Sequence, residues 1–441
     1  MPSGQRAFRG ALLHFLQDPD RDSGEDAWEY FPDGLLVING THVERAGAAA
    51  DLLPQLPSDC PIQVQENALI LPGFIDTHVH FPQMEVVGAH GERLLDWLEK
   101  YVFPAEARFA DPVHARTVAE RFLDETLRNG TTTALVFGSV HAAALDEFFQ
   151  ACEARNLRMI AGKSMMDRNC PESVRDSARD SYVDSKRLIR KWHGRGRLGY
   201  AVTPRFAATS SPEQLALAGQ LLREHPGVHL QTHISENLDE VAWVSRLFPQ
   251  APHYLATYDQ MGLLGRRSVF AHCLHLSEGE WRRLAQSRSN VAFCPTSNLF
   301  LGSGLFPMAC AREHCVTVGL GTDIGGGTSF SLLQTLNEAY KVLQLQGEHL
   351  SPLKAFHLAT LGGAEALDLA DVLGNFLPGK EADFIIMDTA STPLLAFRTQ
   401  YCRDLTELLF VLSTLGDDRS VRQTWSAGQC VHDRDRARAG A

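Results

Sequence analysis

Residues 72–83 of this chain read Pro-Gly-Phe-Ile-Asp-Thr-His-Val-His-Phe-Pro-Gln. An apolar run leads into this stretch, which predicts a β-strand that ends in polar residues. Side chains two positions apart on a strand point to the same face, so His78 and His80 can bind one metal ion together. A pair of histidines at a strand end also occurs without a metal. The choice between the two interpretations depends on Asp76, Gln83 and residues further along the chain.

The composition is that of a soluble globular protein with a large core. The chain has 441 residues, of which 44% are apolar and 21% are charged. A net charge of −12 argues against nucleic acid and anionic membranes as partners, because both require a basic surface. No apolar run approaches the roughly 20 residues of a membrane helix. The nine scattered cysteines contain no Cys-x-x-Cys pair, which predicts reduced thiols and a cytoplasmic protein.

From residue 68 onward, apolar strand patterns alternate with amphipathic helix patterns. This alternation predicts a parallel sheet, and eight strands over about 250 residues match a (β/α)8 barrel. The predicted strands are residues 68–76, 131–137, 158–163, 198–202, 229–232, 268–271, 290–293 and 316–321. The clearest helix patterns cover residues 112–129, 212–225, 237–248 and 277–287.

The two ends of the chain have shorter extended patterns. Residues 1–67 include a hairpin signal at Asn39-Gly40, and residues 374–441 contain a turn, a strand and a last hairpin. We therefore predict one small β-sandwich domain, built from residues 1–67 and 374–441 around a barrel that spans residues 68–373.

Potential metal ligands follow four of the predicted barrel strands. His78 and His80 end the first strand, His233 the fifth, His272 the sixth and Asp323 the eighth. The carboxyl ends of the strands meet at one face of such a barrel, where its active sites lie. Imidazole and carboxylate ligands suit zinc or ferrous iron, so these residues together predict a metal site.

Several motifs resemble those of a known family. Residues 72–80 and the closing Pro-Gly-Lys-Glu-Ala-Asp of residues 378–383 resemble the amidohydrolase superfamily. Other motifs look like the guanine deaminases within it: Phe81-Pro82-Gln83, residues 166–169 (Met-Asp-Arg-Asn), residues 203–206 (Thr-Pro-Arg-Phe), residues 232–236 (Thr-His-Ile-Ser-Glu) and residues 321–331. The resemblance covers the whole chain and implies a metal-dependent hydrolase that converts guanine and water into xanthine and ammonia.

The resemblance also implies how the metal is held. Two-metal hydrolases of this superfamily typically carry a bridging lysine on the fourth barrel strand, and residues 197–206 contain no lysine. One metal ion per subunit is therefore favoured, with His78, His80, His233 and Asp323 as ligands. Zinc is the expected metal, and ferrous iron fits the same ligands. The resemblance implies that His272 hydrogen-bonds the attacking water instead of binding the metal tightly.

Two carboxylates are predicted to move protons. A bound divalent metal lowers the pKa of a water molecule to about 7, and Asp323 beside it can take that water's proton. Glu236 would protonate ring N3 as the attacked carbon becomes tetrahedral. The alternative for Glu236 is a cap or first-turn acid of the following helix.

Residues near the metal pair suggest the substrate. Arg205 has fixed donors for a purine carbonyl, Gln83 matches a base edge with amide character, and Phe206 could stack on the ring. An arginine at a strand end can equally form a salt bridge, and a phenylalanine can equally belong to the core. Trp97 is either a lid residue or a packing residue. The predicted substrate-binding set is Gln83, Arg205, Phe206, His233, Glu236 and Asp323.

The predicted partner is a small purine, with no nucleic acid and no membrane. Relatives in the resembled family are commonly dimers, which implies a homodimer. Two rival functions remain open at this point. One is a deaminase or chlorohydrolase of the same superfamily that acts on a pterin or triazine ring. The other is a non-catalytic binding protein on this scaffold, which is disfavoured because every metal ligand is present.

Overall fold

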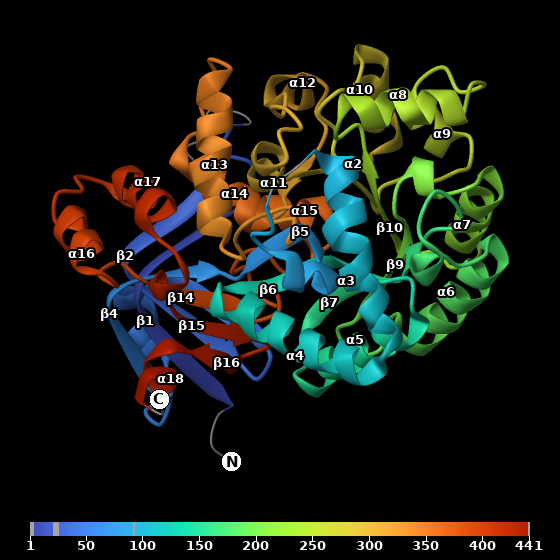
Figure 1. Cartoon of the computed structure of the whole chain (residues 1–441). Helices are drawn as coiled ribbons and strands as arrows, with labels where there is room; N and C mark the ends of the chain where they lie inside the picture. The colour runs from blue at the N-terminus through green and yellow to red at the C-terminus, as the bar shows by residue number, and fades with distance from the viewer. Residues whose placement is uncertain (1–3, 21–25, 91–92, 440–441) are drawn as a thin grey trace.

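The computed structural model describes residues 4–20, 26–90 and 93–439. Figure 1 shows two parts: a barrel of strands surrounded by helices, and a sheet in which the blue and red ends of the chain lie side by side. The terminal sheet therefore unites residues that are hundreds of positions apart in the sequence.

The barrel consists of parallel strands in chain order, which confirms the predicted (β/α)8 class. Its two end strands meet through hydrogen bonds: the Thr77 hydroxyl donates to the Leu320 carbonyl and the Asp323 amide to the His78 carbonyl, both over 2.9 Å. The strands are β5 (Phe74–His80), β6 (Thr131–Phe137), β7 (Arg158–Gly162), β9 (Gly199–Pro204), β10 (His229–Ile234), β11 (Ser268–His272), β12 (Asn290–Phe293) and β13 (Val318–Leu320), with the short β8 (Ser164–Met165) beside β9.

Helices connect the strands, and the four predicted helices are confirmed. Asp111 and Ser211 cap α4 and α7 through their side chains, and each is followed by a proline suited to a first helical turn. In the described residues no helix has the length and apolar character needed to cross a bilayer. The longer helices are α4 (Pro112–Arg128), α5 (Ala142–Ala154), α6 (Ala178–Trp192), α7 (Pro212–Glu224), α8 (Leu238–Leu247), α10 (Glu278–Ser287), α13 (Leu332–Leu345), α14 (Pro352–Ala359) and α17 (Leu405–Leu415).

Shorter helices fill the loops and the connections to the terminal sheet. Two of them, α2 and α3, are joined by a short π-helix, η3 (Leu98–Val102), in the long loop after β5. The short helices are α1 (Ala49–Leu52), α2 (Leu94–Trp97), α3 (Phe103–Ala107), α9 (Tyr254–Asp259), α11 (Pro295–Phe300), α12 (Met308–Glu313), α15 (Leu361–Ala366), α16 (Pro393–Thr399) and α18 (Arg434–Ala439).

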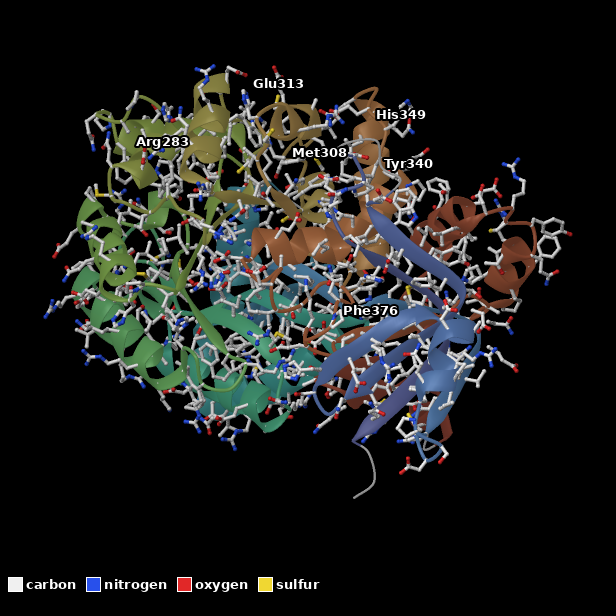
Figure 2. All side chains as sticks on the ribbon, turned by 180° about the vertical axis from the view of Figure 1, so that it is seen from behind. Arg283, Met308, Glu313, Tyr340, His349 and Phe376 are labelled. Carbon is white, nitrogen blue, oxygen red and sulfur yellow. The ribbon has the colours of Figure 1, made fainter. Side chains whose placement is uncertain are left out.

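The terminal sheet has the strand order β16-β15-β14-β4-β1-β2-β3. Its core packs Phe8 against Phe384 and Trp425, with ring centroids 4.8 Å from Phe8 in both cases, and includes Phe376, which Figure 2 labels. The strands are β1 (Gln5–Phe15), β2 (Trp28–Asn39), β3 (His42–Ala48), β4 (Ile62–Pro72), β14 (Phe384–Asp388), β15 (Val421–Ser426) and β16 (Gln429–Asp433).

One predicted strand is wrong in its extent. Residues 68–76 form no single barrel strand, because residues 68–72 belong to β4 and pair with β14, whereas β5 starts at Phe74. Gly73 lies between the two strands, where a Cβ atom would come within 2.1 Å of the Thr132 hydroxyl oxygen. The chain passes from one sheet to the other there, and only glycine allows so close an approach.

A network of ion pairs joins the terminal sheet to the amino-terminal side of the barrel. Arg158 donates to Glu381 over 2.7 Å, and Arg197 donates to the same carboxylate over 2.6 Å. Arg197 also pairs with Asp383 and donates to the Ser426 hydroxyl over 2.8 Å. The closing motif at residues 378–383 thus supplies the acids that neutralise two arginines at the boundary between the two parts.

We expect Glu381→Gln to lower the free energy of unfolding by about 1.5–3 kcal/mol, because a charged acceptor shared by two arginines is lost. Urea unfolding followed by circular dichroism measures this change. The matched control is Glu278→Gln, since the Glu278 side chain is 61% exposed and pairs at the surface. Its expected effect is below about 0.5 kcal/mol. Equal effects of the two substitutions would contradict a stabilising role of the network.

Candidate active site

Four side chains converge at the carboxyl ends of the barrel strands. Nε2 of His80 lies 3.3 Å from Nε2 of His78 and 3.2 Å from Nε2 of His233. Oδ1 of Asp323 lies 3.3 Å from Nε2 of His78 and 3.4 Å from Nε2 of His80. One donor atom from each of these four residues lies within 4.8 Å of the others. Three imidazole nitrogens and one carboxylate oxygen form a set that fits zinc or another divalent transition metal.

The protonation of the histidines agrees with this role. His233 must carry its proton on Nδ1, which donates to the Arg205 carbonyl over 2.7 Å, so its Nε2 lone pair faces the cluster. Burial, together with the neighbouring imidazoles, lowers the pKa values of His80 and His233 well below the usual range. Burial alone would raise the pKa of Asp323, but His78, His272 and His80 hold it below its usual value. Neutral imidazoles and an ionised carboxylate are the forms that bind a metal.

His272 lies beside the four ligands. Its Nδ1 is 2.9 Å from the Asn298 amide oxygen, so Nδ1 carries the proton. Its buried Nε2 has no hydrogen-bond partner among the described residues, and faces Glu236 Oε2 at 3.4 Å and Asp323 Oδ2 at 3.9 Å. His272 Nε2, which lies between the Glu236 and Asp323 carboxylates without a partner, can therefore accept a hydrogen bond from a water molecule that reacts there. Asn298, which orients His272, was not predicted from the sequence, because a lone asparagine after a strand carries no signal of its own.

Asp76 and Gly321 bring the first and last barrel strands together. The Asp76 carboxylate accepts hydrogen bonds from the backbone amides of His78 and Thr322, each over 3.1 Å, and also from the Thr322 hydroxyl. A Cβ atom at Gly321 would lie 2.8 Å from the Cβ atom of His78. The close contact between these strand ends places Asp323 next to the His78 imidazole.

A cavity opens beside the histidine and aspartate cluster. Its apolar wall includes Phe206, which contacts Trp243 edge-to-face, and Trp97, whose side chain is buried. All six predicted substrate-binding residues line the cavity. The lining residues are His80, Gln83, Leu94, Trp97, Leu98, Arg205, Phe206, His233, Glu236, Glu240, Leu301, Asp323 and Gly326.

Glu236 points into the site and does not cap α8. The cap is Asn237, whose side chain accepts from the Asp239 amide over 2.8 Å, and Glu240 completes the capping box. One carboxylate oxygen of Glu236 accepts from the Ser303 hydroxyl over 3.3 Å, and the other faces His272. Burial, with the nearby Asp323 and Glu240 carboxylates, raises the pKa of Glu236 well above its usual value. A carboxyl group in this environment holds a proton that it can donate.

Arg205 and Gln83 share a partner that was not predicted from the sequence. Glu106 of α3 lies with both carboxylate oxygens 2.8 Å from Arg205 Nη1, and accepts from the Gln83 side-chain amide over 3.2 Å. Gln83 Nε2 also lies 3.1 Å from Nδ1 of His80, and Gln83 Oε1 accepts from the Gly325 amide over 3.2 Å. Gln83 is therefore held in place by three neighbours at the edge of the cavity.

The motif at residues 166–169 supports the segment that carries Arg205 and Phe206. Asp167 accepts from the Ser211 amide over 2.7 Å, Arg168 donates to the Ala207 carbonyl over 3.1 Å, and Asn169 donates to the Ala208 carbonyl over 2.7 Å. These residues hold the loop after β9 in place and take no part in the cavity lining. Lys163, at the end of β7, pairs with Asp176 and supports the same region.

The barrel and its cluster of histidines and an aspartate define a class of metal-dependent hydrolases. The model of the amidohydrolase family matches residues 69–431, and the chain belongs to the amidohydrolase family. Members of this family are metal-dependent, in agreement with the cluster described above.

Individual relatives are guanine deaminases, which confirms the resemblance predicted from the sequence. The guanine deaminase of Escherichia coli (strain K12) is 52% identical over 439 residues, covering 99% of this chain and 100% of the relative. The solved E. coli enzyme superposes with a TM-score of 0.95 over 97% of this chain and 100% of that chain. A guanine deaminase from C. acetobutylicum, solved with guanine bound in its active site, has a TM-score of 0.88 at 28% identity, covering 97% of this chain and 100% of that chain.

Proposed function

We propose that the protein hydrolyses guanine to xanthine and ammonia. The observation that carries this proposal is the combination of one metal cluster with a cavity lined by Arg205, Gln83 and Glu236. The full-length similarity to guanine deaminases supports the same substrate. Deamination of the purine would place the oxo-bearing edge of the ring at Arg205 and Gln83, and its amino-bearing carbon at the metal cluster.

His78, His80, His233 and Asp323 would hold the metal, and His272 would orient the attacking water through Nε2. The ion supplies the activation of that water at neutral pH. Asp323 takes the proton of the water on its free carboxylate oxygen. Glu236 donates its proton to ring N3, which relieves the negative charge that develops there. Asp323 then passes the water's proton to the amino group, which departs as ammonia, and Glu236 recovers its proton from the new hydroxyl group as the carbonyl forms.

The decisive assay measures xanthine formation and ammonia release from guanine by purified, metal-replete protein. Turnover of guanine in preference to a pterin and to an amino-triazine is expected. Protein that left guanine unchanged while deaminating one of the other rings would overturn the substrate assignment. The assignment of the chain to the amidohydrolase family would stand in that case.

The metal is proposed to be a single zinc ion per chain. The set of three histidines and one aspartate supports a mononuclear site. Two-metal hydrolases of the superfamily typically use a lysine to bridge their metals, whereas Lys163 is paired with Asp176. Elemental analysis of protein purified without added metal tests this assignment. Iron as the dominant metal, or two equivalents of metal per active chain, would refute it.

A homodimer in the cytoplasm is proposed for the protein as a whole. All nine cysteines are free in the structure, which supports a reducing compartment. Sedimentation velocity at micromolar concentration tests the dimer, and a single monomeric species would reject it.

We expect Arg205→Ala to lower kcat/KM for guanine by about 10–100-fold, because a charged donor to the purine carbonyl is lost. The competitive inhibition constant of 2-aminopurine, which has the same amino group without the oxo group, should change far less. Initial rates of xanthine formation, with and without 2-aminopurine, measure both quantities. Equal losses for the two rings would argue against a contact between Arg205 and the oxo group.

A further inference from the structure

Glu106 is a buried acid behind two residues of the cavity lining, Arg205 and Gln83, and the proposed mechanism does not use it. It belongs to α3, in the long loop after β5, and its side chain is 1% exposed. Burial of a carboxylate is costly unless the charge is paired and hydrogen-bonded. Among the described residues, the side chains that donate hydrogen bonds to the Glu106 carboxylate are those of Arg205 and Gln83.

The geometry of the Glu106–Arg205 pair is one-sided. Both oxygens of Glu106 lie 2.8 Å from the same nitrogen, Nη1 of Arg205. In the described part of the chain, Nε and Nη2 of Arg205 form no hydrogen bond, and Arg205 lines the cavity. A guanidinium is planar, so a partner on one terminal nitrogen fixes the direction of the remaining donors. The pair therefore keeps donors available to a ligand while its net charge is zero.

The same carboxylate also sets the position of Gln83, whose amide lies between Glu106 and His80. We propose that Glu106 is a positioning residue that presents Arg205 and Gln83 together to the oxo-bearing edge of the purine. This inference rests on the proposed guanine deamination. Neutralisation of Arg205 by Glu106 also makes the site suited to an uncharged carbonyl and not to a carboxylate or phosphate group.

The loop that carries Glu106 also closes the cavity. Leu94 and Trp97 of α2 and Leu98 of the adjoining π-helix form part of the apolar wall. The Arg205 guanidinium lies 5.7 Å from the ring centroid of Phe103. In Figure 1 this loop is the light-blue segment labelled α2 and α3. A purely structural role would make Glu106 the anchor of this loop to β9. The experiment has to separate anchoring from the positioning of Arg205.

The test compares Glu106→Gln, Arg205→Ala and the double variant as full-length, metal-replete proteins. For Glu106→Gln we expect kcat/KM for guanine to fall by about 10–100-fold, mainly through KM, because one charge-assisted contact orients the arginine. The inhibition constant of 2-aminopurine should change by less than about threefold. In the Arg205→Ala background, the Glu106 substitution should cost clearly less than it does in the wild type, because only its contact with Gln83 is left to lose.

Each contrary result has a definite meaning. A parallel loss for guanine and 2-aminopurine, or a full additional loss in the Arg205→Ala background, would overturn the positioning role and leave only the anchor. Wild-type protein that does not deaminate guanine would refute the proposed function itself, which is a separate outcome. The control is Glu381→Gln, which removes a half-buried ion-pair partner away from the cavity and should leave the guanine to 2-aminopurine ratio unchanged.

Glu106→Asp provides a second variant if Glu106→Gln does not fold. It keeps the charge that Arg205 requires but withdraws the carboxylate by one methylene group. A selective loss for guanine of at least about threefold, with 2-aminopurine unaffected, is expected. Wild-type values for both rings would refute the positioning role.

Discussion

Glu236→Gln is expected to lower kcat for guanine by at least about 10², because a positioned acid contributes roughly 10²–10⁴ to a proton transfer. Glutamine keeps the volume of the side chain and can still accept from the Ser303 hydroxyl, which lies 3.3 Å from Glu236 Oε1. It has no proton of comparable acidity for ring N3. The effect should therefore appear in kcat, with a small change in KM, in steady-state xanthine formation.

The control for this substitution is Asp239→Asn. Asp239 is an exposed acid in the first turn of α8, three residues from Glu236, and its side chain is 63% exposed. Normal turnover is expected for Asp239→Asn, and normal metal content is expected for both variants. Near-normal turnover of Glu236→Gln would remove Glu236 from the mechanism, and loss of metal from it would show a structural defect instead.

The metal cluster could be predicted because the topology of the fold brings the strand ends together. A parallel barrel places every carboxyl end at one face, so ligands at the first, fifth and eighth strands meet although they are far apart in the chain. The structure adds why the first and the eighth strand lie so close. The Asp76 carboxylate binds the Thr322 amide over 3.1 Å, and Gly321 leaves room for His78.

Glu106 and Asn298 could not be predicted in the same way. Each acts on a residue far away in the sequence, Arg205 and His272 respectively, from a short helix in a connecting loop. Such loops have no periodic pattern, and their side-chain directions depend on packing against the finished barrel. The strand boundary at Gly73 escaped prediction for a related reason. The apolar pattern continues through it, whereas the pairing of residues 68–72 with β14 and the contact of Gly73 with Thr132 show that the chain changes sheets there.

Asp323→Ala is expected to cause the largest loss, because Asp323 has two roles. Its Oδ1 lies 3.3 Å from Nε2 of His78, in the position of a metal ligand, and Oδ2 faces His272 at 3.9 Å. Loss of one ligand and one proton acceptor together should lower kcat/KM by at least about 10³. Metal content, measured by inductively coupled plasma mass spectrometry after dialysis, should fall well below that of the wild type.

A matched control separates two possible ligand sets that share Asp323. His272 and Cys294 also lie close to this carboxylate, and could in principle form a different metal group with it. Burial raises the pKa of the Cys294 thiol well above its usual value, and Sγ donates to the Ala292 carbonyl over 3.6 Å, so the group stays protonated. Cys294→Ala should therefore retain both metal and turnover. Loss of metal from Cys294→Ala would contradict the assigned ligands, because Cys294 belongs only to the alternative set.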